Sequence, residues 1–254
     1  MDNPCINSMK QLGVCVVVPT YNNAKTLLSV IRGLQEYSSD IIVVNDGSTD
    51  DTGEILQMLS NEVTVISYPK NKGKGYALER GFDAARSRGF QYAVTIDSDG
   101  QHLASELPSF MAALEKHPNG LIIGSRNLRQ ENMPQKNTFA NRFSNFWFAL
   151  QTGKRLFDTQ VGYRVYPLTA MQNMKFHTSR YEAELEMLVR CAWKCIPIIP
   201  VAIEVYYPPR DERVSHFRPF KDFLRISVLN AVLCIVALVY GYPSMCIRKF
   251  VLAK

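Results

Sequence analysis

The sequence lacks the features that would place the protein outside the cytoplasm or on nucleic acid. Residues 1–13 are polar, and the apolar run after them, Val14 to Val18, is too short for a secretory signal core. The six cysteines show no paired metal-ligand spacing and sit mostly in apolar surroundings, which predicts buried, reduced thiols. No helix-turn-helix, zinc-finger or aromatic RNA-binding signature accompanies the scattered Lys and Arg residues. We therefore expect a cytoplasmic protein that does not bind nucleic acid.

The composition is that of a globular enzyme with anionic partners. With 254 residues, of which 46% are hydrophobic and 20% charged, the chain can bury a full core. The formal net charge of +6 favours phosphorylated small molecules or anionic lipid headgroups. There is no internal repeat or low-complexity tract. The sequence predicts one catalytic domain, residues 1–207, followed by a C-terminal tail, residues 208–254.

The tail is basic at first and then apolar. Its apolar segment, Ile226 to Tyr242, has about 17 residues, the lower limit for crossing a bilayer. A basic stretch beside an apolar helix suits an anionic membrane surface, so we expect peripheral attachment at the cytoplasmic membrane face. The alternative is a helix that packs back on the domain or on a membrane partner. The basic residues are Arg210, Arg213, Arg218, Lys221 and Arg225.

Short apolar runs alternate with helix-period segments from Val14 to Ser125, a pattern typical of a mostly parallel α/β sheet flanked by helices. Strands buried on both faces are nearly continuously apolar. The predicted strands are Val14–Val18, Ile41–Asn45, Val63–Ser67, Tyr92–Ile96 and Leu121–Gly124, with helices at Ala24–Tyr37, Thr52–Leu59, Gly75–Arg88 and Ser105–Lys116. Further along we expect a lid or acceptor loop at 127–137, helices at Phe139–Leu150 and Tyr181–Trp193, a strand at Val161–Tyr166 and an edge strand within Ile196–Tyr207.

Ligands of parallel sheets bind beyond the carboxyl ends of the strands. Carboxylate, Gly, Lys and Arg residues follow the predicted strands, which suits a phosphorylated ligand with a cation. Asp97-Ser98-Asp99 comes directly after a buried run, and strand alternation puts both carboxylates on one side. Two adjacent carboxylates with an open face suit Mg²⁺ or Mn²⁺ shared with a diphosphate. An Asp-rich turn is the alternative, but the position after a central strand favours the metal.

Four motifs occur in an order that resembles one enzyme family. They are Val17–Asn23, Val43–Thr52, Asn71–Gly75 and the segment that begins at Asp97. Over roughly residues 13–205 they resemble the family-two glycosyltransferases of the GT-A (nucleotide-diphospho-sugar transferase) fold, particularly the polyprenol-phosphate sugar transferases. The resemblance implies an inverting glycosyltransferase that uses a UDP- or GDP-sugar and a divalent metal, Mg²⁺ or Mn²⁺.

The resemblance also implies roles for donor-side residues. Residues at the matching positions bind the nucleotide-sugar in this family: Pro19, Tyr21, Asn22, Asp46, Lys74, Asp97 and Ser98. Asp46 is expected to contact the base, since a carboxylate accepts the imide or amino hydrogens of a base. Asp97, Asp99 and Gln101 are the implied metal ligands. His102 beside them is expected to be a hydrogen-bond partner only.

Acceptor-side roles follow from the same resemblance. Arg126 is expected to face the transferred phosphate or diphosphate, and Asp158 to lie near the reacting centre. Arg164 either binds anionic oxygens or forms a structural ion pair. A polyprenyl phosphate needs no base, whereas a hydroxyl acceptor of a glycan or glycolipid would need a carboxylate such as Asp158.

The helix start near Tyr181 carries further acids. Relatives carry an acidic residue under the active site here, and Glu182 and Glu186 lie one turn apart on one helix face, whereas Glu184 points elsewhere. The start of a helix also favours acids through its dipole alone.

Two other classes of protein are considered. A sugar-nucleotide pyrophosphorylase would need a glycine-rich, Arg-containing loop where Pro19-Thr20-Tyr21-Asn22 stands. A non-catalytic membrane-associated binding module would leave the carboxylate pair idle. The sequence leaves open the sugar, the nucleotide, and whether the chain forms a homo-oligomer.

Overall fold

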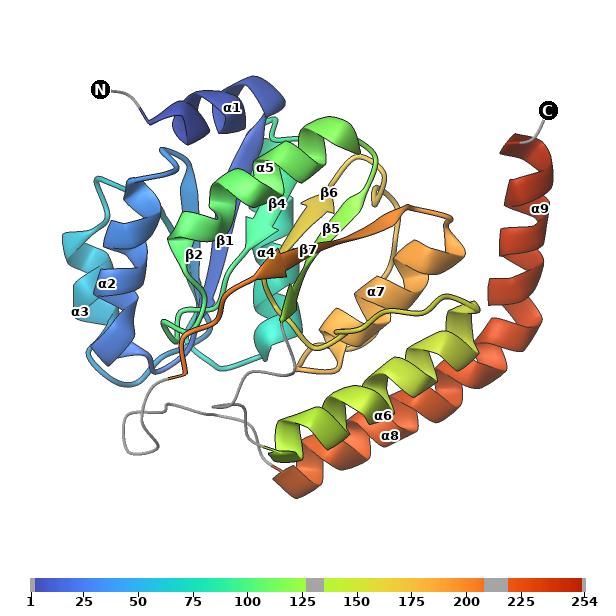
Figure 1. The fold of residues 1–254 in the computed structure, drawn as a ribbon. Helices are drawn as coiled ribbons and strands as arrows, with labels where there is room; N and C mark the ends of the chain where they lie inside the picture. Colours follow the sequence, from blue (N-terminus) through green and yellow to red (C-terminus); the bar gives the residue numbers. More distant parts are fainter. Residues whose placement is uncertain (1–2, 127–134, 208–218, 253–254) are drawn as a thin grey trace.

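A seven-stranded sheet forms the centre of the computed structural model, which describes residues 3–126, 135–207 and 219–252 (Figure 1). The strand order is β3-β2-β1-β4-β6-β5-β7, and β6 alone runs antiparallel to its two neighbours in this sheet. The strands are β1 (Val14–Thr20), β2 (Ile41–Asn45), β3 (Thr64–Ser67), β4 (Tyr92–Thr95), β5 (Leu121–Arg126), β6 (Arg164–Pro167) and β7 (Ile198–Ile203). The predicted mostly parallel α/β sheet flanked by helices is confirmed.

Helices cover both faces of the sheet because the central strands are apolar on both sides. All seven residues of β1 are buried, and they alternate between two cores. Cys15 and Val17 pack with α4 and α7, whereas Val14, Val16 and Val18 pack with α2 and α5. The helices are α1 (Pro4–Leu12), α2 (Ala24–Gln35), α3 (Thr52–Met58), α4 (Lys74–Ser87), α5 (Leu107–Lys116), α6 (Gln135–Thr152), α7 (Ala183–Trp193), α8 (Pro219–Val236) and α9 (Tyr242–Leu252).

The N-terminal helix α1 was not predicted. The Asn3 side chain caps it by accepting a hydrogen bond from the Cys5 amide at 3.0 Å, and Gly13 ends it with φ of +68°. Cys5 and Met9 are its buried residues. Two apolar side chains one turn apart are too few for a clear helical period in a short polar segment.

The second half of the sheet differs from the expected strands in detail. The predicted strand Val161–Tyr166 begins only at Arg164 and pairs antiparallel with β4 and β5. β7 is an edge strand, as predicted, and it pairs in parallel with β5. The predicted helix Ser105–Lys116 begins at Leu107, because a 3₁₀ turn, Ala104–Glu106, precedes it. Part of the predicted 127–137 loop is the start of α6, and the rest lies outside the described residues.

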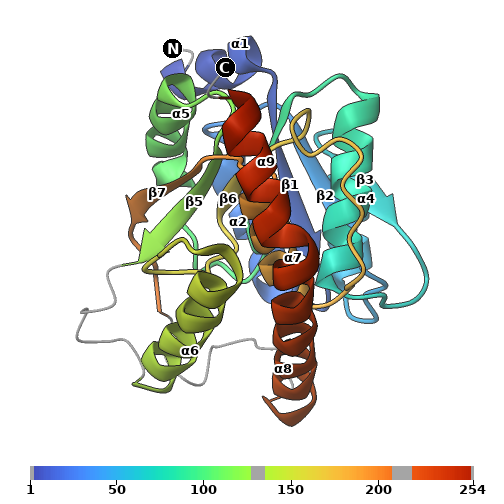
Figure 2. The ribbon, with the colours of Figure 1, turned by 90° about the vertical axis from the view of Figure 1, so that its right-hand side faces the viewer.

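The C-terminal segment is one long helix rather than a short apolar stretch. α8, the wide π turn Ala237–Gly241 and α9 follow without a break (Figure 2). Within the described residues, Phe220–Arg248, with 29 residues, is the helix long and apolar enough to cross a membrane, and its mean hydropathy is 2.2 over an 18-residue stretch. The predicted apolar segment, Ile226 to Tyr242, lies inside this longer helix.

One side of this long helix belongs to the protein core. Leu229, Leu233 and Ala237 are buried with residues of α4 and α7. The Gln151 side chain of α6 donates to the side-chain oxygen of Asn230 at 2.9 Å. A Cβ at Gly241 would lie 2.5 Å from Trp193 Nε1, so the helix can approach Trp193 only with glycine there. The tail and the predicted catalytic domain thus share one core.

The cysteines and the charged surface agree in part with expectation. All six cysteines are free thiols, and Cys5, Cys15 and Cys191 are buried. Cys246, on α9, is exposed.

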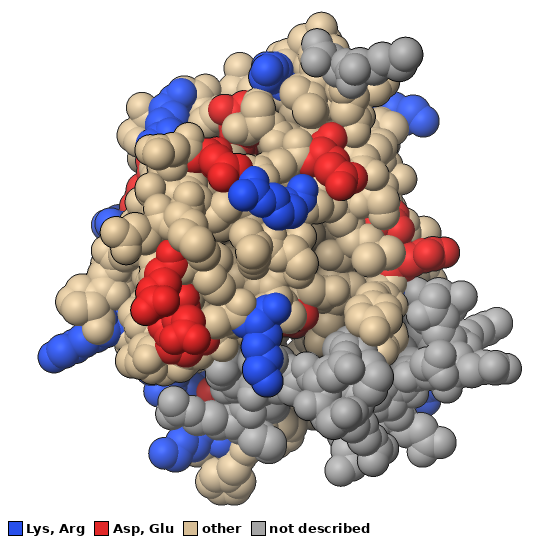
Figure 3. Space-filling model, turned by 90° about the vertical axis from the view of Figure 1, so that its left-hand side faces the viewer, with Lys and Arg blue, Asp and Glu red and all other residues tan. Residues whose placement is uncertain are grey.

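On the face that carries α2 and α3, basic and acidic side chains are interspersed (Figure 3). Where described residues form that face, the basic side chains do not join into one continuous field.

Candidate nucleotide-sugar and metal site

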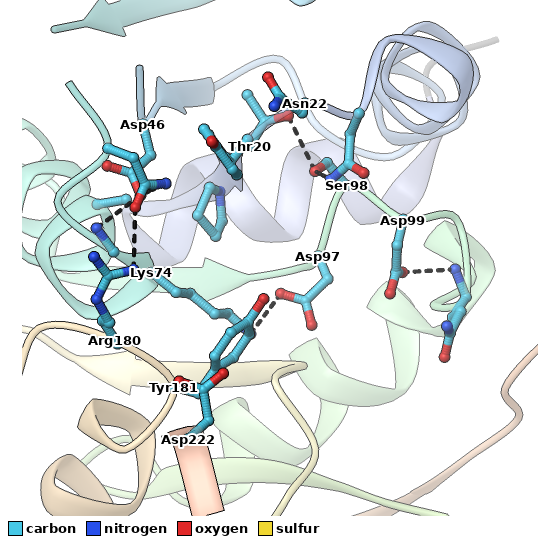
Figure 4. A pocket seen from close by; sticks show the side chains of 17 residues that line it. Thr20, Asn22, Asp46, Lys74, Asp97, Ser98, Asp99, Arg180, Tyr181 and Asp222 are labelled. Atoms are coloured by element: carbon cyan, nitrogen blue, oxygen red, sulfur yellow. Dashed lines mark hydrogen bonds and ion pairs between the residues drawn. The ribbon is translucent and has the colours of Figure 1, made fainter. Parts of the chain in front are cut away.

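A cavity of about 410 Å³ opens at the carboxyl ends of β1, β2 and β4. This is the edge at which the sequence motifs were expected to meet (Figure 4). Its lining residues are Pro19, Thr20, Tyr21, Asn22, Asn23, Asp46, Asn71, Gly73, Lys74, Ala77, Asp97, Ser98, Asp99, Gln101, Arg180, Tyr181 and Asp222. All the predicted nucleotide-sugar and metal residues are among them.

Hydrogen bonds join the loops that follow β1, β2 and β4. Asn22 has a left-handed backbone, with φ of +50°, and its side-chain oxygen accepts from the Thr49 amide at 2.7 Å. Asn23 Nδ2 donates to Ser98 Oγ at 2.7 Å, and Ser98 Oγ donates to Thr20 Oγ1 at 3.1 Å. The cavity wall is therefore preorganised by side chains of three separate motifs.

Asp46 holds the next loop in place. Its carboxylate accepts from Asn71 Nδ2 at 2.9 Å and from the amides of Lys72 and Gly73 at 2.7 and 2.8 Å. Gly47, with φ of +69°, allows the close approach, since a Cβ there would lie 2.5 Å from the carbonyl carbon of Lys70. Contact of Asp46 with a base stays a prediction; what the structure adds is its hold on the 71–73 segment.

Lys74 and Asp97 form the charged centre of the cavity. Lys74 is the first residue of α4, and its Nζ lies 2.7 Å from Asp97 Oδ1 and 2.8 Å from Glu184 Oε2. Burial by itself would lower the pKa of Lys74, but Asp97 and Glu184 raise it above its ordinary value. Lys74 is therefore an ammonium at neutral pH, held beside the first carboxylate of the predicted metal pair.

Asp99 is the second carboxylate of the pair. Its Oδ1 accepts from the Gln101 amide at 3.0 Å. Burial and the neighbouring Asp97 raise the pKa of Asp99 to about 6. Burial is the larger of the two causes, and a divalent cation bound by both carboxylates would favour the ionised form of each.

The residues present fit a hard divalent cation. Among the described residues no group of three or more His, Cys, Asp or Glu side chains could hold a metal ion, so the candidate ligands here are two carboxylates and an amide. Asp97 and Asp99 offer carboxylate oxygens, and Gln101 an amide oxygen, at the wall of an open cavity. Mg²⁺ and Mn²⁺ accept such oxygen donors and take their remaining ligands from phosphate and water.

His102 lies at the rim of this group but is not a cation. Burial lowers the pKa of His102 to about 4, so its ring is neutral at pH 7. The ring centroid is 5.4 Å from that of Tyr163, and the backbone forms an isolated bridge to Val205. Its Nδ1 is buried without a hydrogen-bond partner among the described residues, so the expected role of the side chain as a hydrogen-bond partner is not seen.

Asp158 and Arg126 do not line the cavity. Arg126 Nε and Nη2 donate to Asp158 at 2.7 and 3.0 Å, which is a bidentate pair. Asn141 Nδ2 and the Gln160 amide also donate to this carboxylate, at 2.6 and 3.1 Å. The Asp158 side chain has no exposed surface. This corrects its expected role as an available base, because its lone pairs are already occupied.

Arg164 is a structural residue. It is almost fully buried, and its guanidinium donates to the carbonyl oxygens of Val161, Thr159 and Glu184 at 2.7, 2.9 and 2.8 Å. The prediction that it binds anionic oxygens of a ligand is therefore corrected. The alternative of an ion pair is also wrong in detail, since its main partners are backbone carbonyls.

The acids of α7 are arranged differently from the prediction. Glu184 pairs with Lys74 at the site, whereas Glu186 accepts from Thr178 Oγ1 and pairs with Arg190, both at 2.7 Å. The helix begins at Ala183, and the direction in which Glu184 points depends on how α7 packs against α4. The prediction that Glu184 points away from the face shared by Glu182 and Glu186, toward somewhere other than the site, is therefore wrong.

Some polar lining residues were not predicted as site residues, among them Arg180, Tyr181 and Asp222. Arg180 Nη1 donates to Asn71 Oδ1 at 3.2 Å, and Tyr181 follows it along the same wall. Asp222 comes from α8, so the C-terminal helix contributes directly to the cavity (Figure 4). No local sequence pattern marks Asp222, because its neighbours in the sequence are basic and apolar residues.

Comparison with known proteins identifies the family. The model described as glycosyl transferase family 2 matches residues 15–177. The human dolichyl-phosphate beta-glucosyltransferase is 30% identical over 223 residues, which cover 76% of this chain and 67% of that protein. The UDP-N-acetylglucosamine–dolichyl-phosphate N-acetylglucosaminyltransferase of Methanococcus voltae is 29% identical over 215 residues, with coverage of 76% and 86%.

A solved structure shares the fold. Glucosyl-3-phosphoglycerate synthase from Mycobacterium tuberculosis, crystallised with Mn²⁺, UDP-glucose and phosphoglyceric acid, superposes with a TM-score of 0.66. Identity is 19%, and the match covers 92% of this chain and 82% of that one. At this identity the likeness shows the fold.

Proposed function

The chain belongs to glycosyltransferase family 2, and we propose that it moves a sugar from a nucleotide-diphospho-sugar to a polyprenyl phosphate. The observation that carries the donor half is the cavity at the carboxyl ends of β1, β2 and β4, where Asp97, Asp99 and Lys74 meet. Relatives whose names specify dolichyl-phosphate acceptors support the acceptor half. Those names specify glucose in one case and N-acetylglucosamine in the other, so they leave the sugar open.

In the proposed donor complex, Asp97, Asp99 and Gln101 would hold Mg²⁺ or Mn²⁺. The bound cation would neutralise charge on the diphosphate leaving group. Lys74 places an ammonium at the same end of the cavity, where it can stabilise developing negative charge. Pro19, Tyr21 and Asn22 line the cavity as the expected nucleotide-binding segment.

The arrangement around Asp158 supports a phosphate acceptor over a hydroxyl acceptor. A phosphate monoester is already an anion at neutral pH, so its oxygen can attack the anomeric carbon without loss of a proton to the enzyme. The carbon–oxygen bond to the diphosphate breaks with its electron pair, and the nucleoside diphosphate leaves. Asp158, the carboxylate expected to serve a hydroxyl acceptor, has its oxygens occupied by Arg126, Asn141 and Gln160.

The long C-terminal helix supports a location at the membrane surface, where a lipid phosphate would be found. Its outward side is apolar, and Leu238 and Val239 are 72% and 77% exposed. Its inward side packs on α6, so the described helix is held along the domain. We therefore propose that it lies against the cytoplasmic membrane face with its outward side in the lipid interface. The other large exposed apolar residues of the helix are Phe220, Phe223, Leu224, Val228, Val232, Ile235, Tyr240, Ile247 and Phe250.

The test is a donor and acceptor screen with purified protein. UDP-glucose, UDP-N-acetylglucosamine and GDP-mannose are each incubated with Mn²⁺ and a short polyprenyl phosphate, and the lipid is analysed by mass spectrometry. We expect one donor to give a sugar-phosphate lipid. The matched acceptor control is the same polyprenol without phosphate. Transfer to the alcohol but not to the phosphate would contradict the proposal and indicate a hydroxyl acceptor.

A further inference from the structure

Lys74 lies between two carboxylates that come from different elements. Asp97 follows β4, and Glu184 lies in the first turn of α7. The ammonium is within 2.8 Å of both, so it is shared rather than committed to one partner. Only small fractions of the three side chains are exposed.

Gly162 forms the floor of this cluster. A Cβ on Gly162 would lie 2.8 Å from Asp97 Oδ2, 2.9 Å from Lys74 Nζ and 3.1 Å from Glu184 Oε1. The Gly162 carbonyl is fixed by a hydrogen bond of 2.7 Å from Thr95 Oγ1. The three charged groups therefore converge above one backbone position that has no room for a side chain.

The two oxygens of Glu184 are in different situations. Oε2 accepts from Lys74, whereas Oε1 is buried and has no hydrogen-bond partner within the part of the chain that the structure describes. A buried carboxylate oxygen without a partner is unfavourable. It is therefore a ready acceptor for an ammonium that moves only a short way from Asp97.

Lys74 and a divalent cation would compete for Asp97. An ammonium at 2.7 Å from Oδ1 occupies one carboxylate oxygen and cancels part of the charge that attracts a cation. We propose that Glu184 is a positioning residue that draws the Lys74 ammonium away from Asp97, which leaves the Asp97 carboxylate to the divalent cation. The inference rests on the proposed function, because it assumes that Asp97 is a metal ligand.

The experiment measures binding of Mn²⁺ alone to the full chain by electron paramagnetic resonance titration. Glu184→Gln keeps the shape of the side chain but removes its charge, so Lys74 should pair with Asp97 and weaken Mn²⁺ binding by roughly 10- to 100-fold. The matched control is Glu186→Gln, which removes a buried, ion-paired carboxylate on the same helix outside the cavity. It should leave the dissociation constant for Mn²⁺ unchanged.

A double-mutant cycle identifies Lys74 as the intermediary. In a Lys74→Met background, Glu184→Gln should have no further effect on Mn²⁺ binding, because no ammonium remains to be positioned. This pair also tests the inference if Glu184→Gln alone does not fold, since it removes both members of the ion pair together. An equal loss of affinity in both backgrounds, or no loss in either, would overturn the inference.

Calorimetric titration of the wild-type chain with UDP in the presence of Mn²⁺ separates this inference from the proposed function. Binding of both Mn²⁺ and UDP by the wild type, together with an unchanged Glu184→Gln variant, overturns the role of Glu184 alone. Absence of both from the wild type overturns the donor site itself.

Discussion

Replacement of Asp158 by Asn separates a structural carboxylate from a catalytic base. The substitution keeps the size of the side chain and exchanges one acceptor oxygen for an NH₂ group. Oδ1 accepts from Asn141, Gln160 and Arg126 Nη2, whereas Oδ2 accepts, among the described residues, from Nε and the backbone amide of Arg126. The new NH₂ group should therefore turn toward Arg126, where the fewest hydrogen bonds are lost.

The structure allows the cost of Asp158→Asn to be worked out. Two donors of Arg126 lose their acceptor, a charged one worth about 1.5–3 kcal/mol and a neutral one worth about 0.5–1.5 kcal/mol. The sum, about 2–4.5 kcal/mol, overlaps the roughly 3–5 kcal/mol expected when one member of a buried ion pair is removed. Because 15% of the Arg126 side chain is exposed, water can solvate part of it. We expect a loss of about 3 kcal/mol in the free energy of unfolding.

Urea unfolding followed by circular dichroism measures this loss. A loss of about 3 kcal/mol moves the unfolding midpoint by about 1 M urea when the slope is about 3 kcal/mol per M. The matched control is Asp83→Asn, because Asp83 is 51% exposed and pairs with Arg80 and Arg86 at the surface. That change should cost less than about 1 kcal/mol.

Activity measured on the same Asp158→Asn variant gives the result that would refute the reasoning. A catalytic base can be lost without a change in stability. If Asp158→Asn is as stable as the Asp83→Asn control and yet transfers no sugar, Asp158 acts as a base and its structural assignment is wrong.

Three further changes test the metal site, the α7 acid and the tail. Asp99→Ala should abolish Mn²⁺-dependent UDP binding and donor turnover with an unchanged circular dichroism spectrum; retained turnover would contradict the metal assignment. Burial raises the pKa of Glu186. Hydrogen bonds from Thr178 and His177 and the Arg190 charge lower it by more than burial raises it, so the net pKa lies below its ordinary 4.5. Its contribution is therefore present above pH 4.5 and is lost as the pH falls, and the stability difference between wild type and Glu186→Gln, measured by urea unfolding, should shrink below pH 4.5. Leu238→Glu should reduce flotation with anionic vesicles, whereas Leu28→Glu on α2 should not; equal flotation of all three proteins would argue against the proposed membrane face.

The donor half of the site could be predicted from the sequence. Runs such as Val14–Val18 and Ile41–Asn45 are apolar at every or nearly every position, and only strands covered on both faces bury such runs. The polar residues directly after them must then lie at one edge of the sheet. Asp46 and Asp97 are therefore brought together by strand pairing alone, and the cavity contains every donor-side residue that the motifs indicated.

The acceptor side depends on contacts that have no local signature. Arg164 and Asp158 look like ligand-binding residues in the sequence, yet in the fold their polar atoms are used by neighbouring carbonyls, amides and Arg126. Whether a charged side chain binds a ligand or supports the backbone is decided by which groups pack around it, and those groups come from distant segments.

The sequence by itself determined the family, the carboxylate pair and Lys74. The order and spacing of the motifs along the chain were sufficient to predict them. Only the tertiary structure decided that Glu184 is the acid beside Lys74 and that Asp222 of the tail reaches the cavity. The physical reason is that both depend on how one helix packs against another, α7 on α4 and α8 on α6. Helix packing is set by many weak contacts between whole faces, and no short sequence pattern specifies it.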